Sequence, residues 1–179
     1  MRILAFAASN SKQSINKQLV SHAARVLKSD ILPNAEIEII DLNNFEMPLY
    51  SIDRETENGI PEQAHQFFKK IGAADALLIS FAEHNGLYTA AYKNIFDWVS
   101  RIEKAVYQNK PMVILATSPG RRGGSNVLDI AVQSAPFFSG EVKASLANPS
   151  FNHSFDPGAG QLIDAELQVK LKLALSTLV

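Results

Sequence analysis

The sequence predicts a doubly wound α/β fold, in which a five-stranded parallel sheet of order 2-1-3-4-5 lies between helices on both faces. Two observations predict it. Five short apolar segments recur along the 179 residues, and segments with the period of amphipathic helices lie between them. Because strand and helix alternate five times, right-handed crossovers place helices on both faces and make a three-layer sandwich. Five strands with none left over favour this order over a six-stranded dinucleotide fold.

The five apolar segments are the expected strands. Four of them are nearly continuous in apolar residues or rich in Ile and Val, as is typical of strands buried on both faces of a parallel sheet. The segments are RILAFAA (2–8), AEIEIID (35–41), ADALLISFA (74–82), PMVILATS (111–118) and EVKASLA (141–147).

The segments between the strands carry apolar residues three or four apart, which form one stripe on a helix. The stripes are Ile15, Leu19, Ala23 and Val26; Ala64, Phe67, Phe68 and Ile71; Leu87, Ala91, Ile95, Trp98 and Ile102; and Val127, Ile130, Ala131 and Ala135. An amphipathic helix over 163–178 closes the chain. The polar segment 51–62 is expected to be a mobile surface loop, with the next helix beginning near Pro61. Since no linker or repeat occurs, we expect a single domain over 1–179.

Composition and charge exclude several classes of function. The chain is 46% apolar and 20% charged, which is ordinary for a globular protein. Lys plus Arg (17) nearly balance Asp plus Glu (18) without a basic patch, so no nucleic-acid partner is expected. The absence of cysteine excludes a disulfide framework, a thiolate nucleophile and a zinc ribbon, and favours a cytoplasmic location. No apolar run reaches the roughly 18 residues of a membrane span, so no membrane partner is expected.

Ligands of open α/β sheets bind outside the carboxyl ends of the strands, so the loops after the first, third and fourth strands matter most. The first loop, SNSKQSIN (9–16), is rich in hydroxyls and amides that can donate to phosphate oxygens at a helix N-terminus. Two interpretations stay open. Ser9, Ser11, Ser14, Asn10 and Asn16 surround a phosphate monoester, or Ser14 or Ser11 simply caps the helix. Neither the Walker sequence nor the GxGxxG turn is present, which argues against nucleoside triphosphate hydrolysis.

The loop after the fourth strand, SPGRRGGSN (118–126), contains three glycines. Gly120, Gly123 and Gly124 let backbone N–H groups approach a flat ligand, whereas an ordinary turn needs only one or two glycines. Arg121 and Arg122 lie between them and face either an anionic ligand or solvent.

These loops resemble those of the NADPH-dependent FMN reductase family, whose flavodoxin-like members read approximately GSxRxxSxN, PEYNxSxxGxLKNxIDW and SxGxxGG. The corresponding stretches here are ASNSKQSIN (8–16), AEHNGLYTAAYKNIFDW (82–98) and SPGRRGG (118–124). The resemblance covers nearly the whole chain. Its middle motif is the most specific, because it keeps six residues in register: Glu83, Asn85, Lys93, Asn94, Asp97 and Trp98.

The resemblance implies an FMN-binding flavodoxin-like protein and a set of cofactor-binding residues. Those expected near the phosphate are Ser9, Ser11, Ser14, Ile15 and Asn16; those along the isoalloxazine edge are Glu83, His84, Asn85 and Gly86; those over the pyrimidine edge are Ser118, Gly120, Gly123 and Gly124. The motif residues farther along the helix are expected to be structural, with Trp98 in the core and Lys93 and Asp97 forming an i, i+4 pair.

The chain also departs from the family pattern. The frequent Arg of the first loop is replaced by Ser11 or Lys12, the Pro before the glutamate is Ala82, and the family's Tyr is His84. The Ser after Asn gives way to GLYT. These changes affect FMN affinity and the shape of the substrate pocket.

The implied chemistry belongs to the cofactor. FMN accepts hydride from NADPH or NADH and passes it to a small acceptor such as a quinone, a free flavin, an azo dye or an oxidised metal ion. No catalytic side chain is therefore assigned. Two roles stay open for His84: its ring contacts the flavin or an acceptor oxygen, or it only packs and hydrogen-bonds within its loop. His22, His65 and His153 show no metal-ligand spacing, so no metal is expected.

Two other classes of function stay open. A flavodoxin-type electron carrier shares this fold, although such carriers are usually strongly acidic and this chain has a formal net charge of −1. A non-redox nucleotide- or phosphate-binding module follows if the altered middle loop rejects the ring. Family members commonly pair through helices 3 and 4, and a second apolar face is expected here from Tyr88, Tyr92, Phe96 and Val99, so a homodimer or homotetramer is expected.

Overall fold

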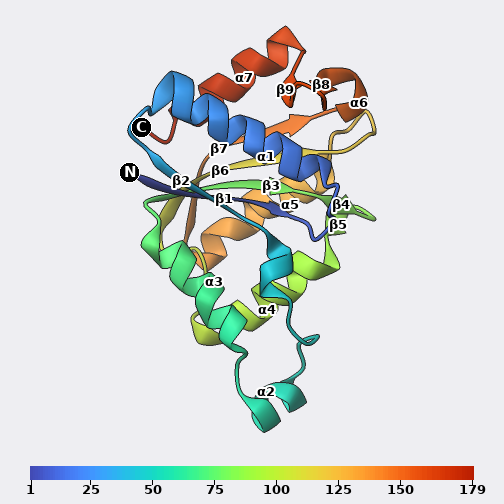
Figure 1. Cartoon of the computed structure of the whole chain (residues 1–179). Coiled ribbons are helices and arrows are strands. Elements are labelled where there is room, and N and C mark those ends of the chain that lie inside the picture. Colours follow the sequence, from blue (N-terminus) through green and yellow to red (C-terminus); the bar gives the residue numbers. More distant parts are fainter.

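The computed structural model describes residues 1–179 and has the predicted central sheet (Figure 1). Five parallel strands pair in the order β2-β1-β3-β6-β7, which is the predicted order 2-1-3-4-5. Their bounds are β1 Arg2–Ala8, β2 Glu36–Ile40, β3 Ala76–Phe81, β6 Lys110–Thr117 and β7 Gly140–Asn148. Every residue of the central strand β3 is buried, whereas only the two end residues of the edge strand β7 are buried and those between them are exposed or partly buried. The near-continuous apolar sequence of β3 is therefore explained by its burial on both faces.

Helices cover both faces of the sheet and complete the predicted sandwich. Helices α1 (Ile15–Val26) and α7 (Ala165–Ser176) lie on one face, and α3 (Glu62–Ala73), α4 (Ala90–Ile102) and α5 (Ser125–Ser134) lie on the other (Figure 1). A π-helical turn, η1 (Leu27–Ile31), extends α1. Because successive side chains of a strand point to opposite faces, β1 supplies both cores. Leu4 and Phe6 pack against α3 and α4, and Ile3 and Ala5 pack against α1.

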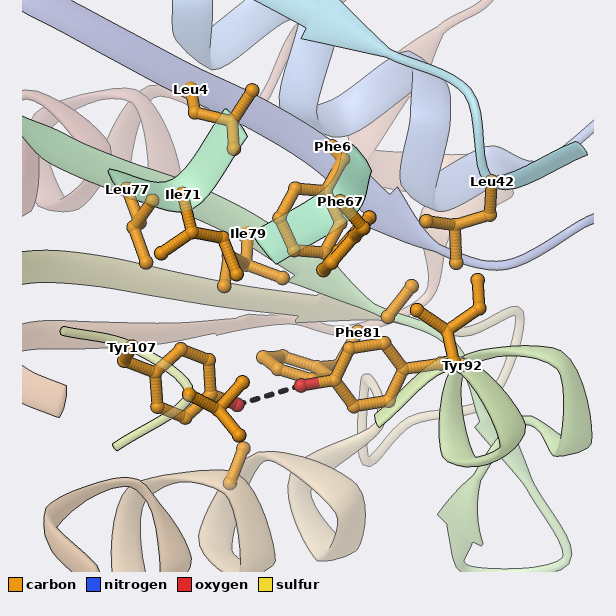
Figure 2. Packing of buried hydrophobic residues seen from close by; sticks show 14 of the residues in the cluster. Leu4, Phe6, Leu42, Phe67, Ile71, Leu77, Ile79, Phe81, Tyr92 and Tyr107 are labelled. Atoms are coloured by element: carbon orange, nitrogen blue, oxygen red, sulfur yellow. Dashed lines mark hydrogen bonds between the residues drawn. The ribbon is translucent and has the colours of Figure 1, made fainter. Parts of the chain in front are cut away.

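Aromatic side chains fill the centre of the core beneath α3 and α4 (Figure 2). Phe6 meets the edge of Phe67 at a centroid distance of 5.4 Å, and Phe81 meets Tyr92 edge-on at 5.2 Å. The hydroxyl of Tyr92 lies 2.6 Å from that of Tyr107, and both side chains are buried. Burial raises the pKa of both phenols. These two hydroxyls therefore depend on each other for hydrogen bonding within an apolar environment.

The expectation of a mobile loop over 51–62 is wrong for most of that segment. Residues Ile52–Asn58 form the short helix α2, which projects from the body of the protein (Figure 1). The Ser51 hydroxyl caps it by accepting from the Arg54 N–H at 3.2 Å. The composition suggested a loop because none of the helix residues is buried, and without an apolar stripe the helical period cannot be recognised.

The segment that carries α2 is anchored to α4. The Asn94 amide accepts from the N–H of Tyr50 at 2.8 Å and donates to the carbonyls of Met47 and Pro48. The indole N–H of Trp98 also donates to the Pro48 carbonyl, at 2.7 Å. The motif residues on α4 therefore have structural roles, as expected, and Lys93 and Asp97 form the expected ion pair at 2.7 Å.

Helix α4 begins three residues later than its predicted stripe. Leu87 lies in a two-stranded hairpin, β4 (Glu83–His84) and β5 (Leu87–Tyr88), and is 58% exposed rather than part of a helix. The predicted second apolar face is also wrong. Tyr92 and Val99 are 2% and 0% exposed, and Tyr88 and Phe96 pack against the same core. The apolar arc of α4 is wide because the helix contacts α3 and residues 42–45 in addition to the core beneath it.

The remaining elements are short. They are the 3-10 turns η2 (Leu42–Phe45) and η3 (Ala135–Phe138), the helix α6 (Phe151–Ser154) and the hairpin β8 (Phe155–Asp156) and β9 (Gln161–Leu162). His22 of α1 packs edge-on against Phe155 at 5.9 Å. Burial, and secondarily the charge of Arg25, lower the pKa of His22. None of the helices combines the length and the apolar character needed to cross a membrane.

Candidate functional site

Three loops meet at the carboxyl edge of the sheet, where the sequence predicts the ligand. We call them the first loop (residues 9–14), the hairpin (residues 83–88) and the glycine loop (residues 118–124). They follow β1, β3 and β6, which are neighbours in the sheet. Parallel strands all end at the same edge, so the three loops are brought together by the topology alone (Figure 1).

The first loop presents hydrogen-bond donors at the start of α1. Ser9 and Ser14 are both 7% exposed, and their hydroxyl oxygens accept from the N–H groups of Ser11 and Lys17, each at 3.2 Å. Each hydroxyl therefore retains its own hydrogen for a ligand. The N–H groups of Ile15 and Asn16 lie in the first turn of α1, where the helix offers no partner. Ser14 is thus the helix cap, and the loop also has the donor set of an anion site.

Asn16 differs from the other polar residues of this region. Its side chain is 2% exposed and is directed into the sheet. Its Oδ1 accepts from the Ser80 hydroxyl at 2.8 Å and from the Thr117 N–H at 3.0 Å, and its Nδ2 donates to the Thr117 carbonyl at 3.1 Å. Only the main-chain N–H of Asn16 remains at the open end of α1.

The hairpin turns at Asn85 and Gly86, whose φ angles are +53° and +82°. Positive φ at both positions is typical of the Asn-Gly turns that close two-residue hairpins. The Glu83 carboxylate accepts from the Val127 N–H at 3.0 Å, at the start of α5. Its negative charge suits the helix N-terminus, where the N-cap Gly124 provides no side chain. Glu83 is therefore used within the protein, whereas His84 and Asn85 are exposed.

Thr89 fixes the base of the hairpin. It is 1% exposed, its hydroxyl donates to the Ala8 carbonyl at 3.0 Å, and it caps α4 by accepting from the Tyr92 N–H at 3.2 Å. The Tyr88 hydroxyl lies 3.0 Å from that of Ser134 on α5. The sequence interpretation missed these contacts, although a Thr just before a helical period is a recognised cap signal.

The glycine loop is tightly packed on one side and open on the other. Gly123 and Gly124 have φ angles of +59° and +77°. A Cβ on Gly123 would lie 2.6 Å from the backbone nitrogen of Pro149, and a Cβ on Gly124 would lie 3.1 Å from Ala116. At Gly120 the nearest atom is the Ser118 hydroxyl at 3.7 Å. Gly123 and Gly124 are thus required by the packing of the loop itself, while Gly120 leaves room for a ligand.

The cations around the loops differ in their partners. Lys17 bonds to Asp41 at 2.5 Å, and this hydrogen bond lowers the pKa of the Asp41 carboxyl. Arg122 donates to the Asn126 side chain at 2.6 Å. Lys12 and Arg121 are exposed and make no ion pair. Lys12 is therefore the unpaired cation of the first loop, in place of the Arg found in the resembling motif.

An apolar cavity of about 210 Å³ opens beside the first loop. It lies between η2 and the first turns of α4, and Asn10 contributes to its wall. Leu42, Phe45 and Ala91 provide part of its apolar lining, and Glu46 adds a carboxylate to the wall. An uncharged aromatic molecule suits such a lining better than a charged one does.

Comparison with known proteins identifies relatives for the chain. The profile of the NADPH-dependent FMN reductase family matches residues 1–153, which include all three loops. A quinone reductase of Escherichia coli is 26% identical over 174 residues, covering 92% of this chain and 86% of that protein. An NAD(P)H-dependent FMN reductase of Pseudomonas aeruginosa is 29% identical over 181 residues, covering 94% of this chain and 92% of that protein. The solved structure of FerB, a flavoenzyme NAD(P)H:(acceptor) oxidoreductase from Paracoccus denitrificans, aligns with a TM-score of 0.76 at 18% identity, covering 99% of this chain and 94% of that one, which supports the fold.

Proposed function

Since the chain belongs to the NADPH-dependent FMN reductase family and is an NAD(P)H-dependent flavin oxidoreductase of the quinone-reductase type, we propose that its three converging loops bind FMN. The bound FMN would transfer hydride from NAD(P)H to a quinone. The observation that carries the proposal is the donor set of the first loop. Two buried hydroxyls with unused hydrogens and two free helix N–H groups match the oxygens of a phosphate monoester.

The phosphate of FMN is assigned to the first loop. Ser9 and Ser14 donate through their hydroxyls, and Ile15 and Asn16 donate through their N–H groups. The exposed Ser11 hydroxyl and Lys12 are available from the solvent side. Because the helix dipole and the N–H groups already favour an anion, the site fits a phosphate without the family's Arg.

The ring is assigned to the hairpin and the glycine loop. When bound, FMN supplies hydride acceptance and hydride donation, and the protein orients it. His84, Asn85 and Gly86 present main-chain groups at the tip of the hairpin, while Gly120 and Ser118 approach from the glycine loop. Glu83 positions this arrangement indirectly, because its carboxylate ties the hairpin to α5 at 3.0 Å.

A quinone is the acceptor class favoured by the surroundings of the first loop. The apolar cavity lined by Leu42, Phe45 and Ala91 can receive an uncharged aromatic ring. The relative from E. coli is named a quinone reductase, which agrees with this choice. Azo dyes, free flavins and oxidised metal ions are the comparison acceptors in the assay.

Absorption spectroscopy tests the proposal with the purified protein. Added FMN is expected to give protein-bound flavin bands, anaerobic NADPH or NADH is expected to bleach them, and a quinone is expected to restore them. A Ser9→Ala/Ser14→Ala variant should weaken FMN binding, whereas Ser21→Ala on the same helix should not. Flavin that binds but stays oxidised with both nicotinamides would favour an electron carrier. A protein that binds no flavin would refute the assignment of the loops.

We also propose that the chain acts as a homodimer or homotetramer. Eight large apolar side chains are more than half exposed, among them Leu49 at 70%, Ile52 at 59% and Phe137 at 74%. Burial of such side chains is a common reason for self-association. A monomeric mass in light scattering would exclude this assembly.

A further inference from the structure

Beneath the three loops runs a continuous row of buried polar side chains, which we call the polar row. It crosses the carboxyl ends of the central strands and reaches the segment after β7. Its members are 0–6% exposed and are Ser80, Asn16, Thr117, Asn148 and Ser154. Buried polar groups are tolerated when they are hydrogen-bonded, and no buried side-chain nitrogen or oxygen of the chain lacks a partner.

Hydrogen bonds join the members one after another. Ser80 and Thr117 both bond to the Asn16 side chain, at 2.8 Å and 3.0–3.1 Å. The Thr117 hydroxyl donates to the Asn148 carbonyl at 2.7 Å and accepts from the Asn148 Nδ2 at 3.1 Å. The Ser154 hydroxyl lies 3.0 Å from the Asn148 Oδ1. Thr117 is therefore the middle member, because its main chain meets Asn16 and its hydroxyl meets Asn148.

The two ends of the polar row support different loops of the site. Toward one end, Asn16 lies two residues after the first loop, and its side-chain bonds hold the first turn of α1 against the sheet. At the other end, residues 148–151 hold the glycine loop. The Ser150 N–H donates to the Gly120 carbonyl at 2.9 Å, and the Phe151 N–H donates to the Ser118 carbonyl at 3.1 Å. Gly123 lies so close to this segment that it has no space for a side chain.

We propose that the polar row couples the two ends of the flavin site, with the Thr117 hydroxyl as the positioning group that joins the first loop to the glycine loop. The inference rests on the proposed function, which assigns the phosphate to the first loop and the ring to the hairpin and the glycine loop. Thr117 is 1% exposed and touches no ligand itself. Its effect on the ligand passes through Asn148 and Asn16.

The coupling follows from what happens when the hydroxyl is removed. Thr117→Val keeps the shape of the side chain but leaves the carbonyl and Nδ2 of Asn148 without their partner. Leaving buried polar groups without hydrogen-bond partners costs free energy, so the segment 148–151 is expected to shift until they find new partners. The glycine loop moves with it, and the Thr117 main chain that meets Asn16 relaxes as well. Hydrogen-bond networks of this kind change as units rather than pair by pair.

Flavin titrations test the coupling without measuring turnover. Fluorescence quenching gives the Kd of the wild-type chain for FMN and for riboflavin, which lacks the phosphate. The ratio of the Kd for riboflavin to the Kd for FMN measures how much the phosphate contributes to binding. We expect Thr117→Val to weaken FMN binding by about tenfold or more and to reduce the ratio by about threefold or more. Thr117→Ser, which restores the hydroxyl, should return both values toward wild type.

Two further variants serve as controls. Asn152→Ala removes an exposed amide from α6, next to this segment, and should change neither Kd. Ser154→Ala removes only the last hydroxyl of the polar row, so it gives a milder change should Thr117→Val fold poorly. Equal weakening of FMN and riboflavin by Thr117→Val, with an unchanged ratio, would show independent loops and overturn the proposal. Failure of Thr117→Ser to restore the ratio would overturn it as well.

Amide hydrogen exchange of the flavin-free protein separates this proposal from the proposed function. In Thr117→Val, we expect faster exchange both at the Ser150 N–H, which bonds to Gly120, and at the Lys17 N–H, which bonds to Ser14. Faster exchange at Ser150 alone would refute the coupling. A wild-type chain that binds neither flavin would refute the proposed function, while the exchange result would still decide whether the loops are coupled.

Discussion

Removing one hydroxyl of the buried Tyr92–Tyr107 pair is expected to cost more free energy of unfolding than removing both. The two oxygens lie 2.6 Å apart in an aromatic environment, and neither has another hydrogen-bond partner within the protein (Figure 2). Tyr92→Phe or Tyr107→Phe leaves one buried hydroxyl unpaired. The double Phe variant leaves none.

The magnitude follows from the desolvation of the orphaned group. An unpaired buried hydroxyl costs about 1–3 kcal/mol, whereas replacing both partners with apolar groups of the same shape is nearly neutral. For a chain of this size, about 1 kcal/mol corresponds to about 2–4 °C in Tm. Each single variant should therefore lose about 2–12 °C. The double variant should lose less than either single variant, because it leaves no buried hydroxyl unpaired.

Urea unfolding of the wild type, both single variants and the double variant gives the complete cycle. A double variant that loses as much free energy of unfolding as a single variant, or more, would refute the argument that the hydroxyls satisfy each other. The pH dependence gives a second reading. Because burial raises the pKa of both phenols above the value of about 10 in the unfolded chain, their contribution is present below pH 10 and is lost as the pH rises above it. The double Phe variant should lose stability less steeply in that range.

Three other variants test separate features. Gly123→Ala places a methyl group 2.6 Å from backbone at a positive φ, and it should lower the free energy of unfolding in urea by about 2–4 kcal/mol. Gly59 also has a positive φ but lies in open space, so Gly59→Ala should lower it by only about 1–2 kcal/mol. Equal losses would contradict the packing argument. Asn94→Ala should speed amide exchange at Tyr50 with little change elsewhere, and unchanged exchange at Tyr50 would mean that the anchor lies elsewhere. Since burial and a neighbouring charge lower the pKa of His22, its contribution to the free energy of unfolding is present above about pH 6.5 and is lost as the pH falls below that value. His22→Gln should make the free energy of unfolding depend less steeply on pH in this range. An unchanged slope would assign the pH dependence to other groups.

The sheet could be predicted from the sequence because its strands are buried. Residues 76–81 are apolar apart from Ser80 and lie between covered faces, so composition alone marks them as a strand. The helices α1 and α3 could be predicted because one face of each is buried and the other is not. Helix α2 could not, since a helix that buries nothing leaves no periodic signal.

The site could be predicted only in part. The sequence placed the three loops correctly because the ends of parallel strands are fixed by topology. It could not show which way each side chain points. The amide side chain of Asn16 was expected to donate to the ligand, but it bonds into the sheet and leaves only the main-chain N–H at the site. The bond between Glu83 and the start of α5 was not foreseen. The role of Asn148 was equally hidden, because its partner Thr117 is 31 residues away along the chain.

The anchoring of the loops from below separates two kinds of evolutionary change. Thr89, Thr117 and Asn148 hold the loops through buried bonds, whereas His84, Asn85 and Arg121 are exposed on the same loops. Substitutions at the exposed positions can alter which molecules are accepted without disturbing the scaffold beneath them. Substitutions at the buried positions change several loops at once. A library aimed at new electron acceptors should therefore vary the exposed set and leave the buried set untouched.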